Sequence, residues 1–595
     1  MQQKYREHVK CIHIDPPYNT ATSGFIYKNS YQHSSWLSMM CERIEISTRL
    51  LNTKGHFICH IDENEYEKLF LSMDNLNLFN AGTVIWDKRN PMTGGKGIAL
   101  QHEYILWRLR NNESINLPNT TTLSILKKAD DLIKKHGVAS ETVKKEFSRW
   151  INGNNNLSGG EKAYRYIDDE GNVFQSVSLR APEPRADPKF HRPLIHPFTG
   201  KPCAVPPNGF SRTPETLSAM ISKGEILFGD DELTQPRQKS FLKEETTRQL
   251  TSLIQDAMKG KSYISPMGLD FPYCHPVSLY ELIFSVSIKS SDIVLDYFGG
   301  SGTSAHAVIN LNRYDDGNRK YVLVEMGVHF DTATKPRIQK VVYSKDWKDG
   351  KPISREGISH CFKTLRLESY EDTLNNLALK TDAHRDSALA NNPDLQRDYL
   401  LNYFIDVETQ TSQSLLNIAD FRDPTAYKMN IKKPGSEEQS LQAIDLIETF
   451  NWLIGLWVSN IAAPHSFSAE FEREQDPDLP NDQKTRLICK RLKLDDKGDY
   501  WFRLIEGYTL KVPGDETSKV ATLIIWRKQT TDAEKDNVVL QKFLMDKLGI
   551  SPRAQTYDVI YINGSHTLPN PVIEGEKTKV RLIEEAFHNA MWSGE

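Results

Sequence analysis

A tetrapeptide close to the N-terminus carries the groups needed to hold a flat ring that bears an exocyclic amine. Asp15-Pro16-Pro17-Tyr18 follows the short apolar segment 10–14 directly. The two prolines fix φ and remove two N–H groups, so the turn is rigid and presents carbonyl oxygens. Asp15 and the Pro16 carbonyl can accept both amine hydrogens while Tyr18 stacks on the ring, which aims the nitrogen lone pair at an electrophile. The alternative for an isolated tetrapeptide of this kind is an ordinary turn.

A glycine-rich turn between an apolar strand and a helix forms the second motif, in segment 292–303. Glycines let a ligand approach the main chain closely, and the N–H groups at the start of the helix face that ligand. Glu325 stands 23 residues after Gly302, at the end of the next apolar segment, where an acid can accept both hydroxyls of a ribose. The phosphate-binding lysine of a P-loop is missing, which favours a nucleoside over a nucleotide phosphate. The alternative is a plain strand–helix connection.

Alternating strand and helix patterns surround both motifs. This alternation predicts an α/β fold, a doubly wound, mostly parallel sheet with helices on both faces. The two motifs would then meet at one edge of that sheet. The expected strands are 10–14, 55–61, 83–86, 103–107, 292–296 and 320–324, and the expected helices are 36–51, 63–70, 276–287 and 303–312.

The rest of the chain is organised differently. A helical stretch, a hairpin with a glycine-containing turn and a proline-rich basic segment predict an irregular insert at 111–260. Apolar strands at 520–525 and 557–562 predict a separate α/β unit in the tail. In the insert, the helical stretch is 122–150, the hairpin is 164–178 and the proline-rich segment is 182–214. Two further helices are expected, one at 395–404 and a core helix at 450–463.

Composition limits the class of protein. A chain of 595 residues is too long for one core, and its formal net charge of -4 excludes a strongly basic coat but leaves a local nucleic-acid groove open. Seven cysteines without a C-x-x-C pair, the missing signal peptide and the missing 18-residue apolar run predict a cytoplasmic protein without disulfides or a membrane span. No metal is expected, because His33, His56 and His60 have no carboxylate at metal-ligand spacing.

Together, the two motifs resemble those of a known enzyme family. Segments 14–20 and 296–303, in this order, are similar to the circularly permuted beta group of amino-methylating DNA methyltransferases. Segments 33–37, 196–202 and 320–325 resemble the Mod subunits of type III restriction-modification systems. The resemblance implies a Rossmann-like sheet, S-adenosylmethionine as cofactor and methylation of adenine N6 in DNA. The implied partners are double-stranded DNA, a restriction subunit with nuclease or translocase activity and a second copy in a homodimer, with no membrane.

The resemblance also assigns roles to residues and segments. The implied catalytic residues are Asp15, Pro16, Pro17 and Tyr18, and the implied cofactor-binding residues are Asp296, Phe298, Gly300, Gly302, Thr303, Glu325, His275 and Pro276. His275 stands where the family usually has lysine. The implied domains are 1–110 (catalytic half), 111–260 (target recognition), 261–345 (cofactor-binding half), 346–445 (mixed helical connector) and 446–595 (C-terminal α/β domain).

Several alternatives stay open at this point. Cytosine N4 is also an exocyclic amine beside a ring nitrogen, and RNA or a protein amide is a third substrate class. Only nine residues precede Lys10, where the family has a substantial segment, so a truncated, catalytically silent DNA-recognition subunit is another hypothesis. Trp36 lines the base pocket or belongs to the core, and Asp62 supports the site or caps a helix. Six basic residues contact phosphates or form a solvated surface: Arg185, Lys189, His191, Arg192, Lys201 and Arg212.

Overall fold

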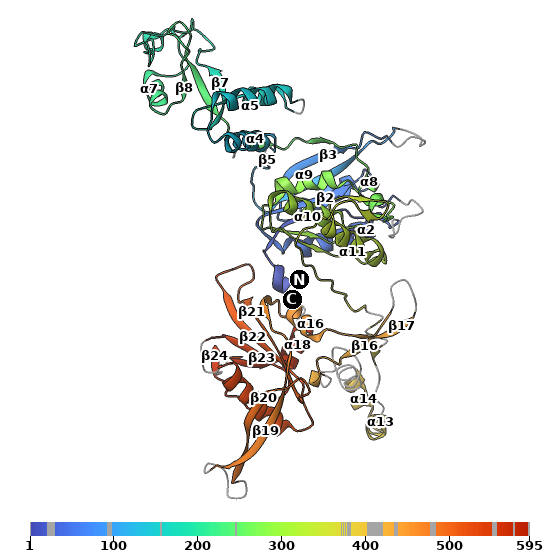
Figure 1. Ribbon diagram of the computed structural model, residues 1–595. Coiled ribbons are helices and arrows are strands. Elements are labelled where there is room, and N and C mark those ends of the chain that lie inside the picture. The colour runs from blue at the N-terminus through green and yellow to red at the C-terminus, as the bar shows by residue number, and fades with distance from the viewer. Residues whose placement is uncertain are drawn as a thin grey trace. The chain divides into compact units, whose positions relative to one another are not determined.

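The computed structural model divides the chain into two compact units (Figure 1). The first unit contains Met1–Glu113 and Ser252–Glu595, and the second, here called the insert unit, is Ser114–Thr251. The described residues are 2–20, 30–91, 98–118, 120–154, 157–243, 247–369, 372, 374, 376–377, 382–400, 421–432, 438–476, 484–549, 556–574 and 577–592. No helix in these ranges combines the length and the apolar composition that a membrane crossing needs.

A seven-stranded sheet, counted over the described residues, lies in the part of the first unit that contains both sequence motifs. Its strand order is β11-β3-β4-β2-β1-β12-β13, and only the two pairings of β4 are antiparallel. The predicted mostly parallel α/β sheet is thus confirmed. The strands are β1 (Val9–Ile14), β2 (Leu51–Ile61), β3 (Phe79–Asp87), β4 (His102–Leu109), β11 (Leu253–Gln255), β12 (Ile293–Asp296) and β13 (Lys320–Leu323).

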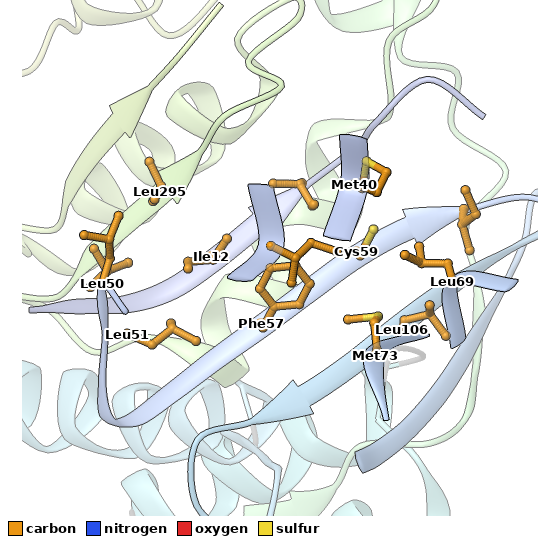
Figure 2. Packing of buried hydrophobic residues seen from close by; sticks show 14 of the residues in the cluster. Ile12, Met40, Leu50, Leu51, Phe57, Cys59, Leu69, Met73, Leu106 and Leu295 are labelled. Atoms are coloured by element: carbon orange, nitrogen blue, oxygen red, sulfur yellow. The ribbon is translucent and has the colours of Figure 1, made fainter. Parts of the chain in front are cut away.

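Helices cover both faces of this sheet because side chains alternate along each strand. On β1, Ile12 and Ile14 join the apolar cluster under α2 (His33–Thr48) and α3 (Tyr66–Met73). Figure 2 shows Ile12 in this cluster together with Met40 from α2 and with Leu69 and Met73 from α3. Cys11 and His13 point to the other face, toward α9 (Val277–Ser287), where Ser287 donates to Cys11 at 3.6 Å.

Strand β1 is paired along both edges. Cys11 lies opposite His56 of β2 and opposite Val294 of β12, in parallel register on both sides. Both edges of β1 are therefore covered by neighbouring strands of the sheet.

The remaining helices near this sheet lie after β11, after β12 and after β13. They are α8 (Lys261–Ile264), η2 (Ser265–Met267), α10 (Thr303–Asp315), η3 (Phe330–Thr334) and α11 (Lys335–Tyr343), and a short helix α1 (Gln2–Tyr5) precedes β1. The pair β14 (Trp347–Lys348) and β15 (Lys351–Pro352) follows. Helix α10 packs against both α9 and α11, so these three helices form the cover of one sheet face.

The insert unit has its own small core. Its four-stranded sheet has the order β6-β7-β9-β8, and the predicted hairpin at 164–178 is confirmed as β6 and β7. The elements are β5 (Asn116–Pro118), α4 (Thr120–His136), α5 (Glu141–Gly153), α6 (Gly159–Lys162), β6 (Tyr166–Ile167), β7 (Val173–Ser178), η1 (Pro188–His191), α7 (Pro214–Ser222), β8 (Ile226–Leu227), β9 (Arg237–Phe241) and β10 (Thr247–Gln249). Strands β5 and β10 pair antiparallel, so the chain enters and leaves this unit through adjacent strands.

The C-terminal part of the first unit forms a second sheet, with strand order β20-β19-β21-β22-β23-β26 and β18 beside β21. Leu523 and Ile525 of β22 face one apolar cluster, while Ile524 and Trp526 face another. The elements are α13 (Ala383–Ala390), α14 (Pro393–Asp398), β16 (Lys428–Lys432), β17 (Gln439–Ala443), α16 (Leu446–Leu453), β18 (Trp457–Ile461), β19 (His465–Gln475), β20 (Thr485–Leu494), β21 (Tyr500–Leu510), β22 (Lys519–Arg527), α17 (Ala533–Lys542), η6 (Phe543–Lys547), β23 (Val559–Ile562), β24 (Val572–Glu574), β25 (Lys577–Thr578), β26 (Val580–Leu582) and α18 (Ile583–Trp592).

The predicted core helix at 450–463 is wrong. Helix α16 ends at Leu453, Gly455 adopts a left-handed φ of 68°, and β18 begins at Trp457. A glycine in this conformation stops a helix and turns the chain. The helix expected at 395–404 is seen only as the end of α14, since residues 401–420 lie outside the described ranges.

Candidate active site

The two motifs lie at the carboxyl ends of adjacent parallel strands. Ile12 of β1 pairs with Leu295 of β12, so the turns that begin at Asp15 and Asp296 leave the same edge of the sheet. From β1 the chain continues through α2 to β2 on one side, and from β12 through α10 to β13 on the other. The strand order reverses at this point, which is where ligands bind in open α/β sheets.

The proline turn is fixed from the core. Trp36 lies on the buried face of α2, and its indole N–H donates to the Pro17 carbonyl at 2.8 Å. Of the two alternatives for Trp36, the core position is the one the structure shows. Tyr18 is fixed at its other end, because its hydroxyl donates to Glu103 of β4 at 3.1 Å.

Asn19, which follows the tetrapeptide, holds the outgoing chain. It has a left-handed φ of 60°, and its side chain bonds both backbone groups of Tyr31, at 2.7 Å to the N–H and 3.1 Å to the carbonyl. Its amide also donates to the buried Glu65 at 2.6 Å, and His33 lies 2.5 Å from the same carboxylate oxygen. His33 therefore has a carboxylate partner that its sequence neighbourhood does not reveal.

A cluster of charged side chains surrounds Asp15. The His275 ring lies between two carboxylates, with Nδ1 3.4 Å from Asp15 and Nε2 3.2 Å from Glu103. Lys88 donates to Glu103 at 2.7 Å. Burial alone would raise the pKa of Glu103, but the cations His275 and Lys88 outweigh it and lower this pKa to about 2. Glu103 is therefore ionised at neutral pH and places a negative charge beside the tetrapeptide.

Two more histidines lie behind this cluster. His13 and His60 contact each other through their Nε2 atoms at 3.0 Å, and burial lowers the pKa of His13 to about 3 and that of His60 well below its usual value. One ligand atom each from His60, Glu103 and His275 lies within 4.8 Å of the others, spacing that a metal ion could use. Since His275 and Glu103 already form an ion pair here, the absence of a metal remains our prediction.

Asp296 shapes the glycine turn from within. Its carboxylate accepts from the Phe298 N–H at 3.0 Å and from the Ser304 hydroxyl at 2.6 Å, and burial raises its pKa to about 7. At the end of β13, Glu325 accepts from the N–H groups of Gly300, at 2.7 Å, and Gly327, at 2.6 Å. The strand-terminal acid and the glycine turn therefore form one structure.

Arg337 of α11 supports the same turn and was not identified from the sequence. Its guanidinium is fully buried and donates to the Ser301 carbonyl and hydroxyl, to the Thr303 hydroxyl and to His306, at 2.8 to 3.2 Å. Burial lowers its pKa to about 10, so it is still a cation at neutral pH. No local pattern marks it, because its partners precede it by more than 30 residues.

The glycine turn fits a ligand that lies against the backbone. Gly300 and Gly302 have left-handed φ values of 49° and 82°, and a Cβ on Gly302 would come within 3.3 Å of Thr334. Gly302 is the N-cap of α10 and has no side chain to cap the first N–H groups of that helix. In this structure the N–H groups of Gly300 and Gly302 and the Glu325 carboxylate bond to neighbouring parts of the turn. The donors that the turn could offer to a ligand are therefore the N–H groups in the first turn of α10.

Other residues singled out in the sequence have local roles. Asp62 accepts from the N–H of Asn64 at 3.0 Å, and burial raises its pKa to about 6. Pro276 precedes the first residue of α9, with φ of -67°. In the insert unit, Lys189 pairs with Asp187 and Lys201 with Glu232, both near 3 Å, while Arg185 lies over the Phe190 ring.

Comparison with known proteins gives one family match. A family model described as DNA methylase matches residues 9–335, more than half of the chain. The chain is 27% identical over 379 residues to the EcoP15I Mod subunit of a type III restriction-modification enzyme from Escherichia coli, covering 57% of each chain. It is 24% identical over 365 residues to the StyLTI Mod subunit from Salmonella typhimurium, covering 54% of this chain and 50% of the relative. The chain therefore spans about half the length of the curated relatives that it matches.

Proposed function

The chain belongs to the DNA methylase family, and from this premise we propose that it transfers a methyl group from S-adenosylmethionine to N6 of adenine in DNA. The observation that carries the proposal is the meeting of two turns at the switch point of the sheet, one after β1 and one after β12. The relatives named above are Mod subunits, which favours adenine N6 over cytosine N4.

The tetrapeptide acts on the amine of the target base. Because that amine is paired and stacked in a duplex, the base must first leave the helix. Asp15 and the Pro16 carbonyl accept the two amine hydrogens, which turns the nitrogen lone pair toward the methyl donor, and Tyr18 stacks on the ring. Glu103 and Trp36 fix Tyr18 and Pro17, so the main contribution of the protein is orientation.

The glycine turn holds the cofactor in this proposal. When bound, S-adenosylmethionine supplies a methyl group on a positively charged sulfur. Asp296 and Phe298 shape the turn, Gly300, Gly302 and Thr303 bring the backbone of the turn and the start of α10 close to the ligand, and Glu325 is the acceptor for the ribose. The buried Arg337 keeps this turn in place.

Replacing Gly302 by valine is expected to abolish cofactor binding at micromolar concentrations. A β-branched residue at φ 82° is strained by about 1–3 kcal/mol, and its side chain would meet Thr334. Calorimetric titration of S-adenosylmethionine onto wild type and variant measures the effect. The matched control is Gly224→Val, a left-handed glycine in the insert unit with open space around its Cβ position. Equal affinity in G302V and wild type would contradict the assignment of this turn.

The insert unit is the proposed target recognition domain. Its exposed residues Arg192 and Arg212 are candidates for phosphate contacts, and its ion pairs at Lys189 and Lys201 are exposed and therefore weak. Base readout would come from side chains that reach the groove edges.

Excising the insert unit is expected to separate cofactor binding from DNA methylation. Pro118 and Thr247 are opposite each other in the β5–β10 pair, so a Gly-Ser linker can replace residues 119–246 without moving β4 or β11. The shortened chain should bind S-adenosylmethionine within about threefold of wild type and lose site-specific methylation. Both quantities are measured on the same preparation, by calorimetry and by methyl incorporation into DNA. Retained sequence specificity would contradict the proposed role.

The proposed function is tested by identifying the product. The chain is expressed in a host that lacks DNA methylation, and its DNA is digested to nucleosides for mass spectrometry. N6-methyladenine is the expected product, N4-methylcytosine would support the runner-up, and no product would support the silent recognition subunit.

As partners we propose double-stranded DNA, a restriction subunit and a second copy of the chain, and as location the cytoplasm, where that DNA lies.

A further inference from the structure

We infer that His275 is a positioning residue that clamps the Asp15 carboxylate by bridging it to Glu103. The inference rests on the proposed function and deepens it, because it assigns to His275 a role on the catalytic turn. The resemblance had implied a contact with the cofactor for this residue. In the structure both ring nitrogens face carboxylates, at 3.4 Å to Asp15 and 3.2 Å to Glu103.

The bridge lies mostly inside the protein and not on its surface. The side chains of His275 and Glu103 are only 13% and 10% exposed, and that of Asp15 is 30% exposed. Glu103 also accepts from the Tyr18 hydroxyl, so the same bridge orients both functional side chains of the tetrapeptide. Oδ2 of Asp15 is the atom nearest to His275, and we assign the other oxygen to the amine of the target base.

Charged and aromatic side chains from several elements surround His275. Asp15 follows β1, Glu103 lies on β4, and Lys88 follows β3. From β2, the His60 ring lies 4.9 Å from the His275 ring, and from α9 the Tyr280 hydroxyl lies 3.2 Å from its Nδ1. The Trp86 ring of β3 lies 5.0 Å from the His275 ring. His13 contacts His60 through the two Nε2 atoms.

The two carboxylates decide the protonation of His275. Burial would lower the pKa of this imidazole, but Asp15 and Glu103 outweigh burial and Lys88, and the pKa is raised above 6.5. The same pairing lowers the pKa of Asp15, but burial, the larger cause, and Glu103 raise it, so the pKa of Asp15 lies above its usual value even with His275 present. This matters for the reaction, because a protonated Asp15 would present a hydroxyl donor to an amine that needs an acceptor.

Histidine and lysine would do this task differently. An imidazolium carries two N–H donors that point in opposite directions, which suits a position between two carboxylates. It also loses its charge at a lower pH than a lysine does. The bridge therefore gives this chain an upper pH limit that a lysine at position 275 would move to higher pH.

The pH dependence of single-turnover methyl transfer distinguishes this role from a merely structural one. In His275→Gln the cation is lost, so the acid limb, set by Asp15, should move up by about one to three pH units. In His275→Lys the acid limb should stay near that of wild type, while the decline at high pH should move upward. The matched control is His8→Gln, which removes another partly buried histidine whose ring lies 3.6 Å from a glutamate, Glu516. Unshifted limbs in both His275 variants would overturn the inference.

A second measurement does not depend on activity. The His275 ring is titrated by NMR in the histidine-labelled full chain, without DNA or cofactor, in wild type, Asp15→Asn and Glu103→Gln. The His275 pKa should lie above 6.5 in wild type and fall in each variant, because each variant removes one anion from the bridge. An unchanged His275 pKa in both variants would overturn the bridge even in an active enzyme. If wild type methylates no DNA but the His275 pKa falls as expected, the proposed function fails and the bridge stands.

Discussion

Asp15→Ala is expected to lower the rate of methyl transfer by about 10²–10³-fold while leaving the affinity for S-adenosylmethionine within about threefold of wild type. In the proposed function the carboxylate is the charged acceptor that orients the target amine, so its loss acts on the chemical step. In this variant Glu103 is the carboxylate that remains to balance the two cations His275 and Lys88. One positive charge is then unbalanced near a cationic methyl donor. Single-turnover methylation and calorimetric binding of the cofactor measure the two quantities separately.

Asp62→Ala is the matched control for this experiment. Asp62 also follows a strand of the same sheet, and its hydrogen bonds to Asn64 are local. The Asp62→Ala variant should retain a rate of methyl transfer within a few-fold of wild type. Normal turnover in Asp15→Ala would show that the tetrapeptide does not orient the amine, whatever the product is.

Trp36→Ala is expected to have the largest effect on stability. A fully buried indole is removed from beneath the tetrapeptide, which costs about 3–5 kcal/mol through lost burial and the cavity that remains. Because the chain has several units, the effect should be read locally, as faster hydrogen exchange in β1 and β2, together with a lower first transition on heating.

Trp36→Phe separates packing from positioning. Phenylalanine keeps most of the apolar volume but cannot donate to the Pro17 carbonyl, which costs about 0.5–1.5 kcal/mol. We expect near-normal exchange in β1 and a reduced rate of methyl transfer. Trp501→Phe in the C-terminal sheet is the control and should leave β1 unaffected. A normal rate in Trp36→Phe would mean that the proline turn needs no anchor.

The two turns could be predicted because their signals are local. Consecutive prolines and closely spaced glycines restrict or free the backbone at the positions where they stand, so the sequence alone indicates a rigid turn and an open one. Strand alternation then places both turns at one edge, as the register of β1 and β12 confirms.

The supporting residues could not be predicted because their partners are distant in the chain. Glu103 lies 85 residues after Tyr18, and Arg337 lies 36 residues after Ser301. One signal was available for Glu103. It is an acid at the start of an apolar strand, and a buried carboxylate requires partners.

The wrong helix at 450–463 has a different cause. A short apolar run fits a buried helix and a buried strand equally well when periodicity is the only guide. Gly455 was the available breaker within this run, and the structure shows that its left-handed backbone separates α16 from β18.

The adjacent entry and exit strands of the insert unit have a consequence for how the proposed enzyme could acquire a new target. Since β5 and β10 bring the two connections to the insert unit together, the proposed recognition domain could be exchanged at two neighbouring points of the chain. The reacting groups around Asp15 and Gly302 all come from outside residues 114–251. If the insert unit is the target recognition domain, replacing it would leave the proposed reaction centre intact, and a new specificity would require no change in the catalytic residues.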